Sequence, residues 1–139
     1  SIGILIENPS FVAEYTGLKN LEMLACIKNK IEIEDIRHAM EQVGLDPGDK
    51  RTYKKYSLGM KQKLGIAAAF MEKPDIIILD EPINALDEAG AKQVHKILEE
   101  QKKRGALIII ACHDKEELEM LSDEIIEIYE GRIVAGEKE

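Results

Sequence analysis

The chain has 139 residues, of which 45% are apolar and 33% charged, so it is long enough for one domain and too short for two full ones. Its longest uninterrupted apolar run covers residues 106–112, far short of the roughly 18 residues that a membrane-spanning helix needs. The formal net charge of −8 is concentrated in residues 114–139, which carry 10 acids and 3 bases, and this balance disfavours a general nucleic-acid-binding protein.

The first half of the chain predicts a short strand and then three helices. Residues 2–6 form an apolar run that turn-forming residues end at Pro9. Apolar side chains then recur at helical spacing in three stretches, with Gly44 placed to end the second stretch and Pro74 to end the third. These stretches are residues 18–25, 33–43 and 58–71. The polar segment 45–56 predicts a loop between the last two helices.

The second half has the pattern of a parallel sheet. Residues 76–79 and 107–111 are unalternated β-branched runs, typical of strands buried on both faces of a mainly parallel sheet. An amphipathic stretch, residues 88–103, separates them and is stopped by Gly105. We therefore expect a strand, helix and parallel strand in this order.

Turn and capping residues organise the C-terminal segment. Asp114 and Glu117 predict a capping box for a short helix. Residues 124–129 and 132–135 predict the two strands of a hairpin around the dipeptide at 130–131.

The two cysteines and the first residues bear on the cellular compartment. Cys26 and Cys112 stand in apolar surroundings without zinc-ligand spacing, which predicts buried free thiols and neither a zinc site nor a disulfide framework. Residues 1–7 lack the cationic segment of a signal peptide, which favours a cytosolic chain. Because the sequence opens inside an expected strand, we interpret its start as a boundary within a larger unit.

Two adjacent carboxylates, Asp80 and Glu81, follow the first buried strand. Ligands of α/β proteins bind at this end of the sheet. Asp80 could hold a hydrated Mg²⁺, and Glu81, pointing the other way along the extended chain, could polarise a water for attack on a γ-phosphate. An acidic pair at a strand end can also be surface turn chemistry, so this motif alone leaves both interpretations open.

The start of the third helix has the properties of a phosphate site. Ser57 is a natural N-cap, and the free N–H groups and dipole of a helix start favour an anion. Residues 50–63 contain six cations and no anion. An ordinary capped helix start with a solvated cationic face explains the same residues.

Two further polar positions follow the strands. His113 comes directly after the second buried strand, so its imidazole should emerge at the same sheet edge as Asp80 and Glu81 and could contact a phosphate oxygen or orient water. A structural histidine is the alternative. Asp87 closes the segment 84–87, and it is equally explained as the N-cap of the next helix.

In this order and at these intervals, the motifs resemble those of the nucleotide-binding subunit of an ABC transporter. Residues 57–62 are similar to the signature motif of this family, and residues 84–87 resemble its D-loop. Asp80 resembles the Walker B aspartate, Glu81 the catalytic glutamate and His113 the switch histidine.

The start of the chain is similar to the segment that enters the Q-loop in bacitracin-type and lantibiotic-immunity exporters, with Glu7 in the place of the usual glutamine. Other departures are Leu58 for a signature glycine, Ile83 for a threonine and Ala85 for a glycine.

The resemblance implies a fold of α/β class, namely part of a P-loop NTPase (RecA-like) core with a buried, mainly parallel sheet, plus an all-α helical subdomain that carries the signature. It implies three segments: the strand and Q-loop approach, the helical subdomain, and the C-terminal half of the catalytic subdomain. Their bounds are residues 1–10, 11–73 and 74–139.

The resemblance also implies a role for each motif residue, with ATP and Mg²⁺ as ligands. Asp80 would bind Mg²⁺, Glu81 would activate water and His113 would contact the γ-phosphate. The other nucleotide-binding positions lie in the signature, the D-loop and the Q-loop. They are Ser57, Gly59, Lys61, Gln62, Asp87 and Glu7.

No window of the sequence fits the phosphate-binding pattern G-x-x-x-x-G-K-[ST]. We therefore expect a fragment that does not hydrolyse ATP alone, from an ATPase subunit that couples hydrolysis to export, with a peptide antibiotic as the candidate substrate. The resemblance implies a transmembrane permease and a second nucleotide-binding subunit as partners, no nucleic acid, and a place on the cytoplasmic side of the membrane. The alternatives are an ABC-type ATPase of DNA repair or translation, and a non-catalytic interaction module.

Overall fold

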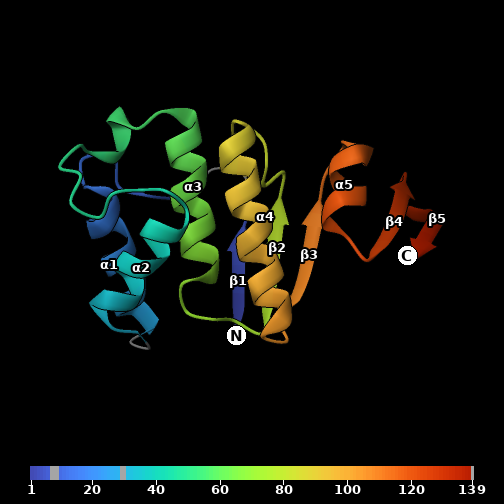
Figure 1. Cartoon of the computed structure of the whole chain (residues 1–139), viewed down its shortest axis with the longest axis horizontal. Helices are drawn as coiled ribbons and strands as arrows, with labels where there is room; N and C mark the ends of the chain where they lie inside the picture. Colours follow the sequence, from blue (N-terminus) through green and yellow to red (C-terminus); the bar gives the residue numbers. More distant parts are fainter. Residues whose placement is uncertain (7–9, 29–30, 139) are drawn as a thin grey trace.

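The computed structural model describes residues 1–6, 10–28 and 31–138. Each strand and helix that the sequence predicts is present there, within a few residues of the expected bounds, and the expected loop at 45–56 contains one short 3₁₀ turn (Figure 1). In chain order the elements are β1 (Ile2–Leu5), α1 (Gly17–Lys28), α2 (Ile33–Gln42), η1 (Tyr53–Lys55), α3 (Leu58–Phe70), β2 (Ile76–Asp80), α4 (Glu88–Lys103), β3 (Leu107–Ala111), α5 (Lys115–Leu121), β4 (Glu124–Tyr129) and β5 (Arg132–Lys138).

The central sheet has the order β1-β2-β3, and both neighbouring pairs are parallel. Helix α4 connects β2 to β3, which confirms the predicted βαβ unit. Because the strands are parallel, their carboxyl ends meet at one edge of the sheet. The segments that follow β2 and β3, residues 81–87 and 112–114, therefore start side by side.

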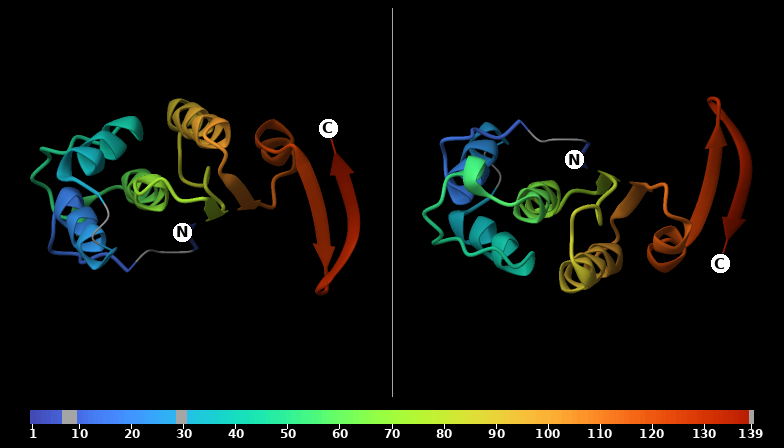
Figure 2. Two further views of the ribbon diagram at one scale, coloured as in Figure 1. Left: turned by 90° about the horizontal axis from the view of Figure 1, so that it is seen from below. Right: turned by 90° about the horizontal axis from the view of Figure 1, so that it is seen from above.

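Helices α3 and α4 cover one face of this sheet (Figure 2). Leu5, Ile77 and Leu79 point into the core on that side and are at most 2% exposed. The other face presents Ile2, Ile4, Leu107 and Ile109, which are 47–57% exposed. The prediction that the strands are buried on both faces is therefore correct for one face only, because the described residues supply helices to just that side.

A close backbone approach fixes α3 against β1. A Cβ atom at Gly3 would lie 1.7 Å from the carbonyl oxygen of Ala69, so only glycine allows this packing. Ala69 is itself buried, with 3% of its surface exposed. The start of α3, which carries Ser57, is thereby held in a fixed place relative to the strand ends.

Helices α1 and α2 pack on α3 at the far end from β3 (Figure 1). Leu21, Met40 and Leu64 are completely buried where the three helices meet. Cys26 is exposed and Cys112 is half-buried, so the prediction of a buried thiol is wrong for Cys26 and only partly correct for Cys112. The inward side of α1 passes through Leu21 and Ala25, and the next residue is turned about 100° away toward solvent.

The chain ends in the hairpin β4-β5, which forms a separate two-stranded sheet. Its turn has positive φ at both Glu130 (48°) and Gly131 (76°), the backbone of a two-residue hairpin turn whose twist matches the strands. Lys102 of α4 donates a 2.7 Å hydrogen bond to Asp123 just before β4. Among the described residues, no helix combines the length and the apolar character needed to cross a membrane.

Candidate active site

Glu81 leaves the end of β2 in an uncommon backbone conformation. Its N–H donates to the carbonyl of Ala111 at 2.8 Å, which extends the pairing of β2 with β3 by one step. Its φ is then +47°, in the left-handed region that costs a non-glycine residue of order 1–3 kcal/mol. Such strain persists where surrounding contacts over-determine the backbone, and here it turns the carboxylate toward β3.

Glu81 and His113 meet at the carboxyl edge of the sheet. The backbone N–H of His113 donates to Glu81 Oε1 at 3.1 Å, and the imidazole Nε2 lies 3.8 Å from the same oxygen. The His113 side chain is fully exposed, whereas that of Glu81 is 33% exposed. The structure therefore brings together the two residues that the sequence nominated as catalytic.

Asp80 is the last residue of β2 and alternates with Leu79, so it lies on the open face of the sheet with Ile76 and Ile78. Its carboxylate is half-buried and forms no hydrogen bond or ion pair with any residue that the structure describes. A free carboxylate is the kind of hard oxygen ligand that Mg²⁺ accepts, and one or two such ligands suffice when phosphates supply the others. The donor at this position therefore fits the predicted metal.

Cys112 joins the catalytic edge to the start of α5. Its Sγ donates to Glu117 Oε2 at 3.3 Å and accepts the N–H of Asp114 at 3.3 Å. Asp114 caps α5 as predicted, by accepting from the N–H groups of Glu116 and Glu117. In a complete capping box the side chain of Glu117 would accept the N–H of Asp114. Here the sulfur of Cys112 accepts this N–H instead.

Burial, followed by the neighbouring carboxylates, raises the pKa of the Cys112 thiol to about 11. The sulfur and one oxygen each of Glu81 and Glu117 lie within 4.8 Å of one another, a spacing that could hold a metal. The hydrogen bonds of Cys112 account for this arrangement without an ion.

The start of α3 presents unpaired donors. Ser57 caps the helix by accepting the N–H of Met60 at 3.1 Å, as its position in the sequence predicts. The N–H groups of Leu58 and Gly59 belong to the first turn, where no helical carbonyl precedes them. A Cβ atom at Gly59 would lie 3.0 Å from the carbonyl of Ala85, so glycine lets the loop after β2 approach the helix.

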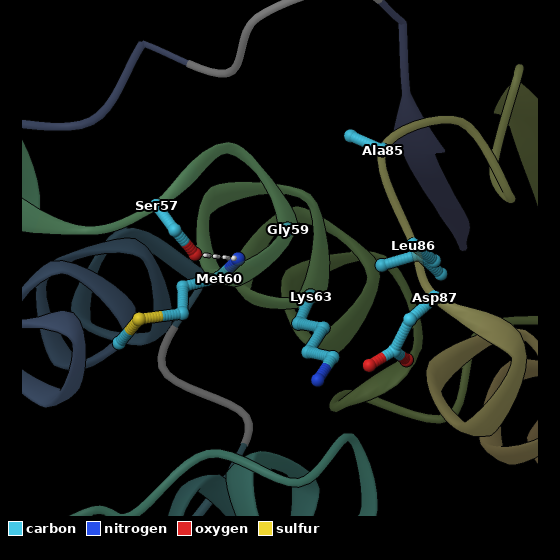
Figure 3. Close-up of a pocket in the computed structure, with 7 residues that line it drawn as sticks. All are labelled: Ser57, Gly59, Met60, Lys63, Ala85, Leu86 and Asp87. Carbon is cyan, nitrogen blue, oxygen red and sulfur yellow. Dashed lines mark hydrogen bonds between the residues drawn. The ribbon is translucent and has the colours of Figure 1, made fainter.

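A groove of about 210 Å³ lies between this helix start and the loop that follows β2 (Figure 3). Three of its lining residues, Ser57, Gly59 and Asp87, were predicted as nucleotide-binding. Lys63 was missed as a site residue, although its spacing of four from Gly59 places both on one helix face. The complete lining is Ser57, Gly59, Met60, Lys63, Ala85, Leu86 and Asp87.

Three of the predicted ligand residues, Asp87, Lys61 and Gln62, have partners within the chain. Asp87 caps α4 by accepting the N–H of Gly90 at 2.7 Å. The ammonium of Lys61 lies 5.1 Å from the centre of the Tyr53 ring. Gln62 donates to the backbone after β2, while Glu7 lies outside the described residues. The ligand and catalytic roles of all the predicted site residues stay predictions.

An acidic pair and a histidine lie at the carboxyl edge of a parallel sheet, and a helix start with free N–H groups follows in the same fold. This arrangement is typical of α/β proteins that bind nucleotides. A profile described as "ABC transporter" matches residues 1–84, which is more than half of the chain. The chain belongs to the ABC transporter family.

Named relatives support this assignment. An uncharacterized ABC transporter ATP-binding protein of Bacillus subtilis, YybJ, is 46% identical over 99% of this chain and 63% of its own length. The bacitracin transport ATP-binding protein BcrA of Enterococcus faecalis is 40% identical over 96% of the chain and 44% of its own length. The lantibiotic transport ATP-binding protein SrtF of Streptococcus pyogenes is 40% identical over 96% and 58%. The chain thus spans roughly half of the length of these relatives.

Solved structures have the same fold. The ATP-binding subunit of an ABC transporter superimposes with a TM-score of 0.87 and 27% identity over 98% of this chain and 58% of that one. The dimeric structure of a bacterial ABC transporter cassette superimposes with a TM-score of 0.88 over 99% of this chain and 62% of that one, at 20% identity. The predicted fold class, part of a nucleotide-binding cassette, is confirmed.

Proposed function

We propose that this chain supplies the signature motif and the catalytic carboxylate of an ATP-hydrolysing subunit that powers an ABC exporter. The observation that carries the proposal is the contact of Glu81 with His113 at the sheet edge, next to Asp80, whose carboxylate has no partner among the residues that the structure describes. Carboxylates and an imidazole at the end of parallel strands are the groups that phosphoryl transfer to water requires.

In this proposal each group at the edge has a separate task. Asp80 holds Mg²⁺, which when bound supplies positive charge that offsets the charge of the phosphates. Glu81 accepts a hydrogen bond from the attacking water and draws off its proton. His113, exposed and hydrogen-bonded through its backbone to Glu81, donates to a phosphate oxygen.

The start of α3 serves a second nucleotide. The free N–H group of Gly59, the hydroxyl of Ser57 and the ammonium of Lys63 belong to residues that line the same groove, where they suit the γ-phosphate held by a second nucleotide-binding subunit. Asp87 lines the opposite wall of that groove. It would therefore connect the phosphate bound at the start of α3 with the loop that carries Glu81.

The named relatives support a proposal for the substrate and the partners. Two relatives are named for bacitracin and lantibiotic transport, which supports a peptide antibiotic as the exported substrate and a transmembrane permease as partner. The helical subdomain, residues 11–73, would contact that permease on the cytoplasmic side, and residues 74–139 would form half of the catalytic subdomain. The 139 residues alone, without the phosphate-binding loop pattern, would not turn over ATP.

The test is Glu81→Gln in the intact protein that contains this chain. Removal of the base is expected to lower the kcat for ATP hydrolysis by roughly a hundredfold or more while ATP still binds. Glu119→Gln, an exposed glutamate of α5, is the matched control and should leave turnover unchanged. Equal turnover in the Glu81 variant and the unaltered protein would show that the catalytic assignment is wrong.

A further inference from the structure

The side-chain amide of Gln62 forms an unusual bridge between α3 and the loop after β2. Its Nε2 donates to the carbonyl of Glu81 at 3.0 Å and to that of Pro82 at 3.0 Å, so both amide hydrogens are used. The orientation of the amide is fixed by chemistry, because two carbonyl oxygens can only be bonded by a donor. The carboxamide nitrogen is thus occupied within the chain.

The loop depends on this bridge for its buried polar groups. Pro82 is fully buried, and Gln62 is the one partner of its carbonyl among the described residues. A buried carbonyl without a partner costs about 1–3 kcal/mol, so loss of the Gln62 donor would favour a different loop conformation.

Glu81 is the residue that this loop must hold in place. Its peptide is tied at the N–H to Ala111 and at the carbonyl to both Asn84 and Gln62. These bonds maintain the left-handed φ of +47°, which in turn directs the carboxylate to His113. Without Gln62, the tie between Glu81 and the helix that bears Ser57 is lost.

We propose that Gln62 is a positioning residue, which fixes the catalytic loop of Glu81 to the start of α3 and does not contact nucleotide through its amide nitrogen. The inference rests on the proposed function and deepens it, since it assigns a task to a residue that the sequence pattern nominated for ligand binding. The carboxylate of Glu81, which serves one nucleotide, would then move together with α3, whose start serves the second nucleotide.

The experiment compares Gln62→Met, which keeps the length and removes both donors, with Gln62→Lys, which restores a donor. In the intact protein, Gln62→Met is expected to lower the kcat for ATP by about tenfold to a hundredfold, because small misplacements of a reacting group have that effect. The KM for ATP should stay within about twofold, since binding groups are untouched. Gln62→Lys should recover most of the kcat.

Hydrogen exchange gives a second readout that does not require activity. The amide of Asn84 donates to the carbonyl of Glu81, so its exchange should accelerate in Gln62→Met and be slowed again in Gln62→Lys. Gln42→Met is the matched control and should leave both readouts unchanged, because within the described part of the chain the amide of Gln42 donates only to exposed Glu100.

Two outcomes would overturn the inference. One is a raised KM with unchanged kcat in Gln62→Met, which would make Gln62 a ligand of the nucleotide. The other is a Gln62→Met variant with unchanged kcat and unchanged exchange at Asn84, while Glu81→Gln is inactive. That result would overturn the role of Gln62 and leave the proposed function intact. If instead Glu81→Gln is fully active, the proposed function fails, and exchange at Asn84 still decides whether Gln62 holds the loop.

Discussion

At the scale of single residues, Ala85 shows why glycine is common at its position in the family. Its φ is +66°, which an L-residue adopts at a cost of about 1–2 kcal/mol and glycine adopts freely. Ala85→Gly is therefore expected to raise the free energy of unfolding by about 0.5–1 kcal/mol, after the greater flexibility of the unfolded chain is subtracted. Thermal or denaturant unfolding measures this change.

A helical alanine provides the control for that substitution. Ala91 lies inside α4, where glycine should lower the free energy of unfolding by about 0.5–1 kcal/mol. The two substitutions are chemically identical and should act with opposite sign. Equal destabilisation would mean that the left-handed backbone at Ala85 is not strained.

The two thiols should differ in reactivity. Cys26 is exposed, whereas burial raises the pKa of Cys112 from its ordinary value of 9.0 to about 11. Because the thiolate is the nucleophile, iodoacetamide should modify Cys26 first, and the rate at Cys112 should rise only as the pH approaches 11.

The same shift has a consequence for stability. The protonated thiol is favoured in the folded protein, so its contribution to the free energy of unfolding is complete below pH 9.0 and is lost as the pH rises toward 11.

Peptide mass spectrometry across a pH series measures the modification of the two thiols by iodoacetamide. Unfolded protein, in which both cysteines react alike, is the reference. Rapid modification of Cys112 near neutral pH in the folded chain would contradict the assignment.

At the scale of elements, the close packing of α3 against β1 leads to a prediction about stability. Gly3→Ala would place a methyl group 1.7 Å from the Ala69 carbonyl, and neither backbone can move without separating the helix from the sheet. We expect a loss of more than about 4 kcal/mol in the free energy of unfolding, at the extreme of single substitutions.

Gly136 of β5 is the comparison for Gly3, because a Cβ atom there would meet only the carbonyl of Ile125 at 3.8 Å. Gly136→Ala should leave the free energy of unfolding unchanged or raise it by about 0.4 kcal/mol. Circular dichroism during thermal unfolding distinguishes the two variants. A stable, fully helical Gly3→Ala protein would mean that α3 does not pack as closely as described.

The elements themselves could be predicted from the sequence because each has a local pattern. Helix α4 matches the predicted range 88–103, since it carries a cap at Asp87, an apolar stripe and a stop at Gly105. Strand β3 matches its β-branched run at 107–111. These features depend on neighbours along the chain, which a sequence displays directly.

The contacts of the site depend on residues far apart, and here sequence reasoning was incomplete. The positions of Glu81 and His113 after two expected parallel strands were enough to predict that both lie at the same edge of the sheet. The bridge from Gln62 to the carbonyl of Pro82 was not predicted, because twenty residues separate the two and no local pattern marks it. The left-handed φ of Glu81 was missed for the same reason, since distant hydrogen bonds impose it.

At the scale of the whole molecule, the charges are separated. Residues 114–139 carry a net charge of −7, and the six cations of residues 50–63 precede or occupy the start of α3. The positive segment therefore lies where the proposed phosphate would bind, whereas the acidic segment comprises α5 and the hairpin β4-β5. The overall charge of −8 conceals this division.

The uncovered face of the central sheet is the remaining large-scale feature. Ile2, Ile4, Leu107 and Ile109 are about half exposed and form adjacent rows across β1 and β3, with Ile78 between two of them in β2. Parallel sheets are almost always covered on both faces, and a contiguous apolar patch of this kind binds other apolar groups.

The 139-residue polypeptide should therefore enhance the fluorescence of an apolar dye such as anilinonaphthalene sulfonate. A double variant with Ile4→Thr and Ile109→Thr, which removes two side chains from one row of this face, should lose most of the enhancement and keep its unfolding temperature. The comparison is Ile128→Thr with Ile133→Thr, a cross-strand pair on the hairpin that is 65% and 72% exposed. Because this pair belongs to a small isolated sheet, its replacement should leave most of the dye signal. An equal loss in both double variants would mean that the dye responds to exposed isoleucines wherever they lie, and that the open face has no special affinity for apolar groups.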